Sequence, residues 1–517
     1  MPHDHKPLRR ATAFVATVHV VVALLYWFVL GVTIVHDFGP DKWGWFWQSL
    51  PTELLRTRAT ESIWYMHGQP PLWNILGAIL IKLFGSLHME ALQALHIALG
   101  AGIAGMCVQI VGRVTQAPRV ALATGLIVAL HPALFLFEAY ALYTTVAAFL
   151  VTSAAYLVTR AQEVAATRED SGDPTAPGGQ AALGFVAVVV ALIMTRSVYH
   201  LMLLFGAVPL AVLLIGRPTR RQFAVLLLLV LLPITWYGKN QIQYGFFGAS
   251  SWYGMGLWRT ALFDQERAVL DDLYDTGTLS PVVRVDAFAA PIAYRSLGYD
   301  EESTIPVLSG NDAHNINIPA ISRDYRSSAV LLIKASPAQY LRNVMTAYGN
   351  FATPSTGFDH LEDNRDRISL HAAIEVTTLG RPLVARLENK LGSGYYGSFY
   401  YLLFPAVLLL YGLQVTRRLH PRDVLQRISH DAAPLFMATI VSYTIVIACA
   451  MELGENLRFK FVIEPVFLAL SAIVGYRLVS RRLRSSGQYS ESAKSRCRSR
   501  GRPRCSAPAY EAPSETR

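Results

Sequence analysis

The sequence predicts an all-α polytopic membrane protein with about ten transmembrane helices and a sizeable extracytoplasmic loop region. Its 517 residues are 52% hydrophobic and only 16% charged, and the mean hydropathy is +0.32. Apolar runs are repeatedly long enough to cross a hydrocarbon core of about 30 Å. Basic residues cluster beside these runs, as is typical of a membrane protein whose orientation is set by cytoplasmic Lys and Arg.

The first apolar run, ATAFVATVHVVVALLYWFVLGVTIV, follows the basic stretch HKPLRR. It is rich in aromatic residues and lacks a small-residue cleavage site, so it predicts a retained span at 11–35 and not a cleaved signal peptide. Further spans are predicted at residues 90–112, 119–134, 139–159, 180–196, 198–216, 222–238, 397–415, 433–452 and 459–479.

The segment PPLWNILGAILIKLFG, residues 70–85, is predicted not to cross the membrane. Six basic clusters should share the cytoplasmic side, and the spans alternate correctly only if this segment does not cross. Its double proline cannot lie inside a helix, because each ring removes a backbone donor and clashes one turn back. We therefore expect an interfacial, re-entrant or partial helix at 70–85, with both chain termini in the cytoplasm.

This topology divides the chain into four regions. They are an N-terminal transmembrane module at 1–238 with a first outer loop at 36–70, an extracytoplasmic loop region or small domain at 239–396, C-terminal transmembrane helices at 397–484, and a disordered basic cytoplasmic tail at 485–517. Loops from distant parts of the sequence then converge on one membrane face, as a site at the bilayer surface requires.

The net charge of +10 comes largely from segments that flank spans and from the basic tail. Juxtamembrane basic runs are ordinary signals for topology or attraction to anionic lipid, so the charge predicts a membrane and no nucleic acid as partner. The sequence holds no P-loop and no metal motif of the HExxH or CxxC type. The cofactor is left unknown, with a divalent cation as an open option.

Four carboxylates are candidate catalytic groups. Glu138 lies in the apolar run HPALFLFEAY at a span junction, where an ionisable side chain is costly and often functional; the alternative is a carboxylate favoured by the dipole of the following helix. Transfer of a sugar or acyl group needs a carboxylate near the acceptor. Asp37, Asp41 and Glu53 in the first outer loop satisfy this need, with Asp37 favoured by its place just beyond the first span, although each can equally be a solvated surface group.

Two arginines are candidate ligands for an anionic substrate. Arg196 in IMTRSVYH and Arg458 in GENLRFKF lie at the predicted outer ends of spans, against the positive-inside tendency. A guanidinium presents a planar fork that matches phosphate oxygens. The alternative is a structural ion pair, for example with Glu452 or Glu455. Lys239 and Lys460 give a weaker version of the same signal, because lysines at span ends commonly snorkel to the interface.

The stretch SIWYMHGQPPLWN, residues 62–74, is predicted to be a shaped loop. His67, Gln69 and Trp73 offer donors, acceptors and a stacking face beside the two prolines. Such groups suit sugar or prenyl contacts, although Trp and Tyr are equally expected in interfacial belts. His67 and Gln69 are therefore candidate substrate-binding residues.

In order along the chain, GQPPL at 68–72, Glu138 after HPALFLF, and NLRFKFVIEP at 456–465 resemble the motifs of GT-C integral membrane glycosyltransferases. The likeness is to the branch that holds protein O-mannosyltransferases and the lipid A aminoarabinose transferase, the glycosyltransferase family 39-like proteins. Gln69 replaces the usual Lys, Glu138 replaces an Asp, and the usual Asp-Glu pair of the first loop is absent. The base therefore stays open between Asp37, Asp41 and Glu53.

The resemblance implies transfer of a sugar from a polyprenyl-phosphate donor to a lipid, glycan or protein acceptor on the outer face, with inversion. A first-loop carboxylate would activate the acceptor, and Arg196, Arg458 and Lys239 would neutralise the leaving phosphate. Glu138 would orient a substrate or share a divalent cation. The expected location is a bacterial inner membrane. The alternatives are a transporter or flippase of lipid-linked saccharides, a ligase that uses them, or a structural membrane subunit.

Overall fold

The protein is all-helical in its computed structural model, which describes residues 6–35, 43, 48–171, 179–299, 317–391, 398–417 and 424–499. Within these residues, six helical stretches are long and apolar enough to cross a membrane, or seven if a bent pair is one span. The chain is thus a polytopic membrane protein, as predicted. The six stretches are α1 (Lys6–Phe28), α4 with α5 (Leu72–Thr115), α8 (Thr144–Ser171), α11 (Arg220–Tyr244), α22 (Ala432–Met451) and α23 (Asn456–Ser499).

Five further apolar helices correspond to the four remaining predicted spans. Helix α6 (Pro118–Ala129) and helix α7 (Pro132–Glu138) form the bent pair, with an angle of 48° between them. Helices α9 (Gly179–Thr195), α10 (Met202–Ile215) and α20 (Tyr400–Thr416) are shorter. At about 1.5 Å per residue, helices of this length reach roughly 21 to 26 Å. Ten complete crossings therefore stay a prediction.

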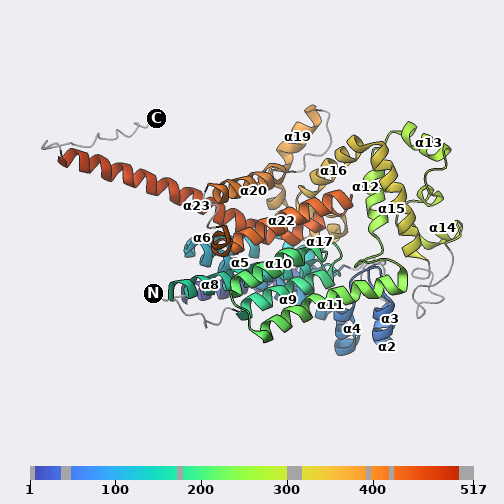
Figure 1. The fold of residues 1–517 in the computed structure, drawn as a ribbon, viewed down its shortest axis with the longest axis horizontal. Helices are drawn as coiled ribbons and strands as arrows, with labels where there is room; N and C mark the ends of the chain where they lie inside the picture. The colour runs from blue at the N-terminus through green and yellow to red at the C-terminus, as the bar shows by residue number, and fades with distance from the viewer. Residues whose placement is uncertain are drawn as a thin grey trace.

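The segment predicted not to cross forms the short helix α4 (Leu72–Phe84). Pro71 lies at its N-cap, outside the helix interior, and its 13 residues span only about 20 Å. Gly85, with φ +55°, and the 3-10 turn η1 (Gly85–Leu87) separate α4 from α5 (His88–Thr115). Figure 1 shows α4 running across the direction of the long helices. This geometry agrees with a partial or interfacial helix.

Contacts between helix termini define one end of the bundle, here called the basic end. Arg113 on α5 pairs with Glu163 on α8, and Arg168 donates to the carbonyl groups of Leu214 and Ile215 at the end of α10. Another ion pair, 2.7 Å long, joins Arg477 of α23 to Asp431 before α22. The basic end lies on the left in Figure 1, with the N-terminus. Several of the predicted basic clusters thus lie at the same end of the bundle. The side of the membrane on which this end lies stays a prediction.

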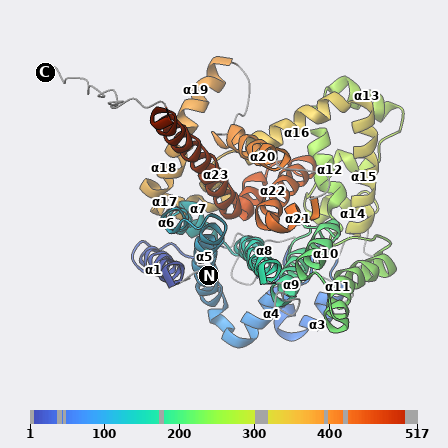
Figure 2. The same cartoon turned by 60° about the vertical axis from the view of Figure 1, so that its left-hand side comes forward.

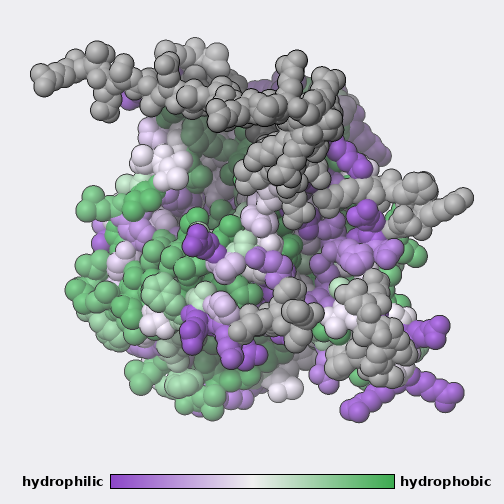
Figure 3. Space-filling view, turned by 90° about the vertical axis from the view of Figure 1, so that its left-hand side faces the viewer, coloured by the Kyte–Doolittle hydropathy of each residue, from purple (hydrophilic) through white to green (hydrophobic). Residues whose placement is uncertain are grey.

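The flanks of the bundle expose apolar side chains. Phe205 on α10, Leu228 on α11 and Leu402 on α20 are all largely exposed. Figure 3, which views the molecule from the basic end, shows a broad hydrophobic flank beside hydrophilic residues. Surfaces of this kind suit contact with lipid.

The opposite end, called the loop end, carries α2 (Thr52–Thr57), α3 (Ala59–Tyr65) and a helical unit with a hydrophobic core of its own (Figure 1). The unit core is formed by side chains such as Trp258, Val282 and Tyr325. A Cβ at Gly254 would lie 1.8 Å from the Ser322 carbonyl oxygen, so two of the unit's helices pack at backbone contact there. The unit contains α12 (Tyr253–Leu262), α13 (Arg267–Asp275), η2 (Pro281–Arg284), α14 (Pro291–Arg295) and α15 (Ile318–Ala335).

The next part of the predicted loop region packs on the main core instead. Phe351, Phe358, Leu361 and Ile368 are buried there. The helices of this part are α16 (Pro337–Phe351), η4 (Ser355–Gly357), η5 (Asp359–Leu361), α17 (Glu362–Arg367), α18 (Ser369–Thr378) and α19 (Arg381–Leu391). After α20 and α21 (Val424–His430), the structure continues α23 to Ser499, into the segment predicted to be a tail.

Candidate functional site

Two buried arginines meet at one tyrosine. Arg196 directly follows α9 and is 1% exposed, and Arg458 lies in the first turn of α23 and is 2% exposed. The Cζ atom of Arg196 lies 5.4 Å from the ring centroid of Tyr143, and that of Arg458 lies 5.7 Å from it. The ring of Phe459 packs 3.9 Å from Arg196 Cζ. We call these four residues the arginine site.

Neither guanidinium of the arginine site is fully paired. Arg458 donates from Nη2 to Glu455, but its Nε and Nη1 atoms have no hydrogen-bond partner among the described residues. The two Nη atoms of Arg196 also have none among these residues. Burial, and also the nearby Arg458 cation, lower the pKa of Arg196 to about 10. Buried unpaired donors carry a large desolvation cost. The arrangement can accept an anion that offers several oxygens, such as a phosphate.

Carboxylates lie beside the arginine site in the link between α22 and α23. Glu455 accepts from Arg458, and Glu452 Oε1 lies 3.4 Å from Arg259 Nη1 on α12. Burial, with the nearby Glu455 charge adding to it, raises the pKa of Glu452 to about 7. The structural ion pair considered as an alternative thus exists for one nitrogen of Arg458 and does not extend to Arg196.

Asp37 and Asp41 lie outside the described residues, but both ends of their loop are placed beside the arginine site. Before the loop, Val35 N donates to Ala139 O at 2.7 Å and Val35 O accepts from Ala141 N at 3.1 Å. After it, Gln48 Oε1 accepts from the Tyr143 hydroxyl. Residues 139–143 therefore hold both ends of the stretch that carries the two aspartates.

Glu53 lies on the surface. Its side chain on α2 is 67% exposed and forms a 3.0 Å ion pair with Arg56 one turn later. Exposed pairs of this kind contribute little to stability. The structure therefore places Glu53 in the environment of a solvated carboxylate.

Glu138 is buried at the end of α7 and faces α1. Its Oε1 atom lies 2.7 Å from His19 Nε2. The other ring nitrogen of His19, Nδ1, lies 2.8 Å from the Ala129 carbonyl oxygen, which can only accept, so Nδ1 donates and Nε2 shares one proton with Glu138. A Cβ on Gly100 of α5 would lie 1.8 Å from Glu138 Oε1.

Phe137, the residue before Glu138, contacts a different helix. Phe137 stacks on Phe461 of α23, with 4.2 Å between the ring centroids. Glu138 thus contacts α1 and α5, whereas Phe137 contacts α23, the helix that carries Arg458. Its catalytic role stays a prediction.

The predicted binding residues of the PPL stretch are held by the C-terminal part of α11 and by the segment that follows it. Lys239 Nζ donates to the carbonyl groups of Trp64 and Met66, at 3.1 and 2.7 Å. His67 Nδ1 lies 2.9 Å from Ser251 Oγ, and Gln69 Oε1 is buried without a hydrogen-bond partner among the described residues. The ammonium group of Lys239 therefore binds backbone carbonyl groups of the loop. Lys239 is not among the residues that form the arginine site.

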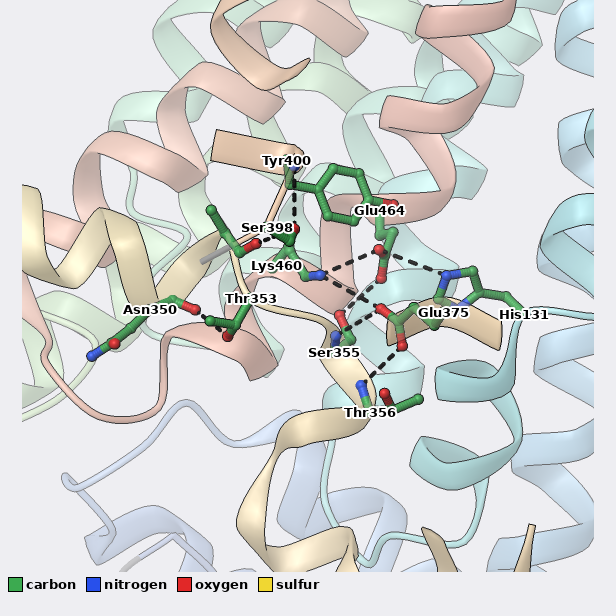
Figure 4. A network of polar contacts seen from close by, with 11 residues as sticks. His131, Asn350, Thr353, Ser355, Thr356, Glu375, Ser398, Tyr400, Lys460 and Glu464 are labelled. Atoms are coloured by element: carbon green, nitrogen blue, oxygen red, sulfur yellow. Dashed lines mark hydrogen bonds and ion pairs between the residues drawn. The ribbon is translucent and has the colours of Figure 1, made fainter. Parts of the chain in front are cut away.

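A buried charge network lies one turn deeper on α23 (Figure 4). Lys460 is 0% exposed, and its Nζ lies 3.4 Å from Glu464 Oε1 and 3.7 Å from Glu375 Oε1. His131 Nε2 lies 3.8 Å from Glu464 Oε1, and Ser355 Oγ donates to Glu464 Oε2 at 2.9 Å. We call His131, Glu375, Lys460 and Glu464 the charge network.

Three members of the charge network have the donor set of a metal site. The ligand atoms of His131, Glu375 and Glu464 lie within 4.8 Å of one another. However, the Lys460 ammonium already provides a cation between the two carboxylates, and a metal ion there would face its repulsion. We therefore interpret the cluster as a buried ion-pair network.

Sequence reasoning missed the charge network. The sequence makes Lys460 only a weak candidate ligand for an anionic substrate, and the structure buries it against two carboxylates. A signal was available, since Glu464 follows Lys460 by four residues in an otherwise apolar run and such pairs share a helix face. Glu375 comes from the loop region and offers no local signal.

Comparisons with known proteins give only distant structural likenesses. No protein-family model matches the chain, and no curated protein matches it. The archaeal oligosaccharyltransferase AglB from Archaeoglobus fulgidus, solved with an inhibitory peptide and a dolichol-phosphate, is 15% identical, with a TM-score of 0.38 over 93% of this chain. The match covers 52% of AglB, so this chain spans about half its length.

The second likeness is to ArnT from Cupriavidus metallidurans. Its apo structure is 13% identical, with a TM-score of 0.33 over 90% of this chain and 77% of ArnT. The structure of ArnT bound to undecaprenyl phosphate gives the same identity and coverage, with a TM-score of 0.28.

Proposed function

We propose that this chain is a membrane glycosyltransferase that moves a sugar from a polyprenyl-phosphate donor to an extracytoplasmic acceptor, with inversion. The observation that carries the proposal is the arginine site. Arg196 and Arg458 bring two buried cations with unsatisfied donors to one tyrosine at the ends of apolar helices. A lipid phosphate is an anion that would reach such a place from the bilayer.

In the proposed reaction, the acceptor oxygen forms a bond to the anomeric carbon of the sugar while the bond from that carbon to the phosphate oxygen breaks. The bonding electrons leave with the phosphate, and Arg196 and Arg458 stabilise the charge that develops on it. A carboxylate takes the proton from the acceptor hydroxyl. Because the displacement is direct, the configuration inverts.

The anchoring of both ends of the stretch between Val35 and Gln48 supports a base on that stretch over Glu53. Both ends of the stretch that carries Asp37 and Asp41 are bonded to residues 139–143, next to the arginine site. Glu53 is exposed and paired with Arg56. We therefore propose Asp37 or Asp41 as the base, and Glu138 with His19 as the pair that holds the end of α7.

The sequence motifs support the same proposal, because GQPPL, Glu138 and NLRFKFVIEP resemble the GT-C glycosyltransferases in order. His67 and Gln69 would contact the donor from the PPL loop. The acceptor can be a lipid, a glycan or a protein. A flippase or a ligase of lipid-linked saccharides would also bind a lipid phosphate with these arginines, so both serve as outcomes of the test.

The test uses the full chain in lipid nanodiscs with a panel of radiolabelled polyprenyl-phosphate sugars and an extract of envelope acceptors. We expect release of free polyprenyl phosphate together with transfer of label, and a loss of about 10²- to 10³-fold in Arg196→Gln and Arg458→Gln. Arg323→Gln, which changes an exposed arginine on α15, is the matched control.

Two results would contradict the proposal. The first is no release from any donor while intact lipid moves between the leaflets of vesicles, which favours the flippase. The second is release only from donors that carry a preassembled oligosaccharide, which favours the ligase.

A further inference from the structure

The segment 355–378, made of η4, η5, α17 and α18, binds the chain just before the first outer loop. Asn364 Nδ2 donates to the Thr33 carbonyl at 2.7 Å, and Arg367 Nη1 donates to the Gly31 carbonyl. Thr33 precedes Asp37 by only four residues. We call segment 355–378 the latch.

His371 of the latch joins two further elements. Its Nε2 lies 2.8 Å from the Leu130 carbonyl oxygen in the hinge between α6 and α7, and its Nδ1 lies 2.9 Å from the Tyr26 hydroxyl on α1. The carbonyl can only accept, so Nε2 donates, and in the neutral ring Nδ1 accepts from the hydroxyl. Burial lowers the pKa of His371, which favours this neutral form. One imidazole thus ties the end of α1 to the hinge before α7.

Glu375 follows His371 by one helical turn and fixes the latch to α23. Its two carboxylate oxygens accept from the backbone N–H groups of Ser355 and Thr356, at 2.8 and 3.1 Å. It also pairs with Lys460 at 3.7 Å. Figure 2 shows α17 and α18 beside α6, α7 and α23. Arg458 lies in the first turn of α23, and the latch contacts the same helix at Lys460. Helix α23 therefore links the latch to the arginine site.

The latch therefore connects three elements that a displacement reaction must hold in one frame: the stretch before Asp37, the hinge at 130–131, and α23. We propose that the latch is a positioning element that fixes residues 31–35, where the first outer loop begins, relative to the arginine site, with His371 as its central positioning residue. This inference rests on the proposed function. A reacting group misplaced by about 1 Å costs on the order of 10²-fold in rate.

The experiment uses the full chain in nanodiscs and two latch variants. His371→Phe keeps a ring of similar size but loses both hydrogen bonds, and Arg367→Gln removes the contact with Gly31 from an exposed side chain that the fold tolerates. Leu370→Ala, at an 88% exposed position on the same helix, is the control.

The first measurement is amide hydrogen exchange without substrate. We expect the amides of Val32, Ile34 and Val35, which are bonded in the structure, to exchange at least 10-fold faster in both latch variants, while those of α4 and the control protein are unchanged. The second measurement is steady-state transfer. We expect kcat to fall by about 10- to 100-fold with the donor KM unchanged, because the arginine site stays intact.

Unchanged exchange at residues 32–35 in both variants would overturn the proposal, as would a rise in donor KM with kcat unchanged. An inactive wild-type protein would contradict the proposed function alone, because hydrogen exchange still decides whether the latch holds the loop stem.

Discussion

Arg458 and Lys460 lie two residues apart on α23 and are both buried, but the number of carboxylates beside them differs. Lys460 Nζ makes no hydrogen bond to the described residues, as is also true of Arg458 Nε and Nη1, yet it lies at ion-pair distance from two carboxylates. Lys460 sits between Glu464 and Glu375, at 3.4 and 3.7 Å. Arg458 pairs through one nitrogen with Glu455, and its Nε and Nη1 atoms have no hydrogen-bond partner among the described residues. The two Nη atoms of Arg196 also lack one among these residues.

The two sites differ in how many carboxylates of the chain lie beside each buried cation. A buried ion stays in a protein at a cost that a partner offsets. Lys460 has its partners within the chain and stabilises the contact between α18 and α23. The arginine site has fewer such partners among the described residues, and under the proposed function its free donors would bind the phosphate of the substrate. Opposite responses to mutation should follow.

The largest effect is expected for Lys460→Met. It leaves Glu375 and Glu464 buried without their counter-cation, and breaking a buried pair costs about 3 to 5 kcal/mol. Denaturant unfolding in detergent should show this loss of unfolding free energy, whereas Lys334→Met, an exposed lysine on α15, should show almost none. Equal stability of the two variants would remove the distinction between the two sites.

Arg196→Met should change stability in the other direction. Replacing a buried guanidinium with unsatisfied donors by an apolar chain should raise the unfolding free energy by about 1 to 3 kcal/mol, while donor binding is lost. The same unfolding assay, together with binding of a polyprenyl phosphate, measures both quantities. A destabilised Arg196→Met protein would place Arg196 with Lys460 among the structural cations.

Gly100→Ala tests whether the His19–Glu138 pair belongs with the charge network as a structural contact. The added Cβ would lie 1.8 Å from Glu138 Oε1 and 2.7 Å from His19 Nε2, so we expect overpacking to cost about 1 to 3 kcal/mol. Gly412→Ala on α20 is the matched control, because its Cβ meets no atom within 4 Å. If both variants unfold alike, α5 yields to the added methyl group and the pair is not closely packed.

Glu452 lies between the buried and the exposed ion pairs in its environment. Its own side chain is largely buried, but its partner Arg259 is partly exposed. Its folded pKa of about 7 lies above the ordinary value of 4.5, so between these pH values the folded state binds more protons than the unfolded state. Stability therefore falls as pH rises through this window, by at most about 1.4 kcal/mol per pH unit. Glu452→Gln should flatten that slope in unfolding curves from pH 4 to 8, and an unchanged slope would assign it to another group.

Sequence reasoning identified the helical membrane fold, the common end of several basic clusters and the two arginines, because each leaves a local mark in hydropathy or charge. It could not find the charge network or the latch, which depend on pairing Lys460 and Leu130 with residues of a loop region whose composition is ordinary. Asp37 and Asp41 lie outside the described residues, so their roles stay predictions.

The separate core of the helical unit at the loop end has an evolutionary consequence. Trp258, Val282 and Tyr325 belong to a core distinct from the main one, with Met451 of α22 at its border, so substitutions within it are constrained mainly by one another. The interior of the unit can therefore vary more independently than the face of α12 that contacts the end of α22. The surface of the helical unit can therefore change without any change in the buried Arg196 and Arg458.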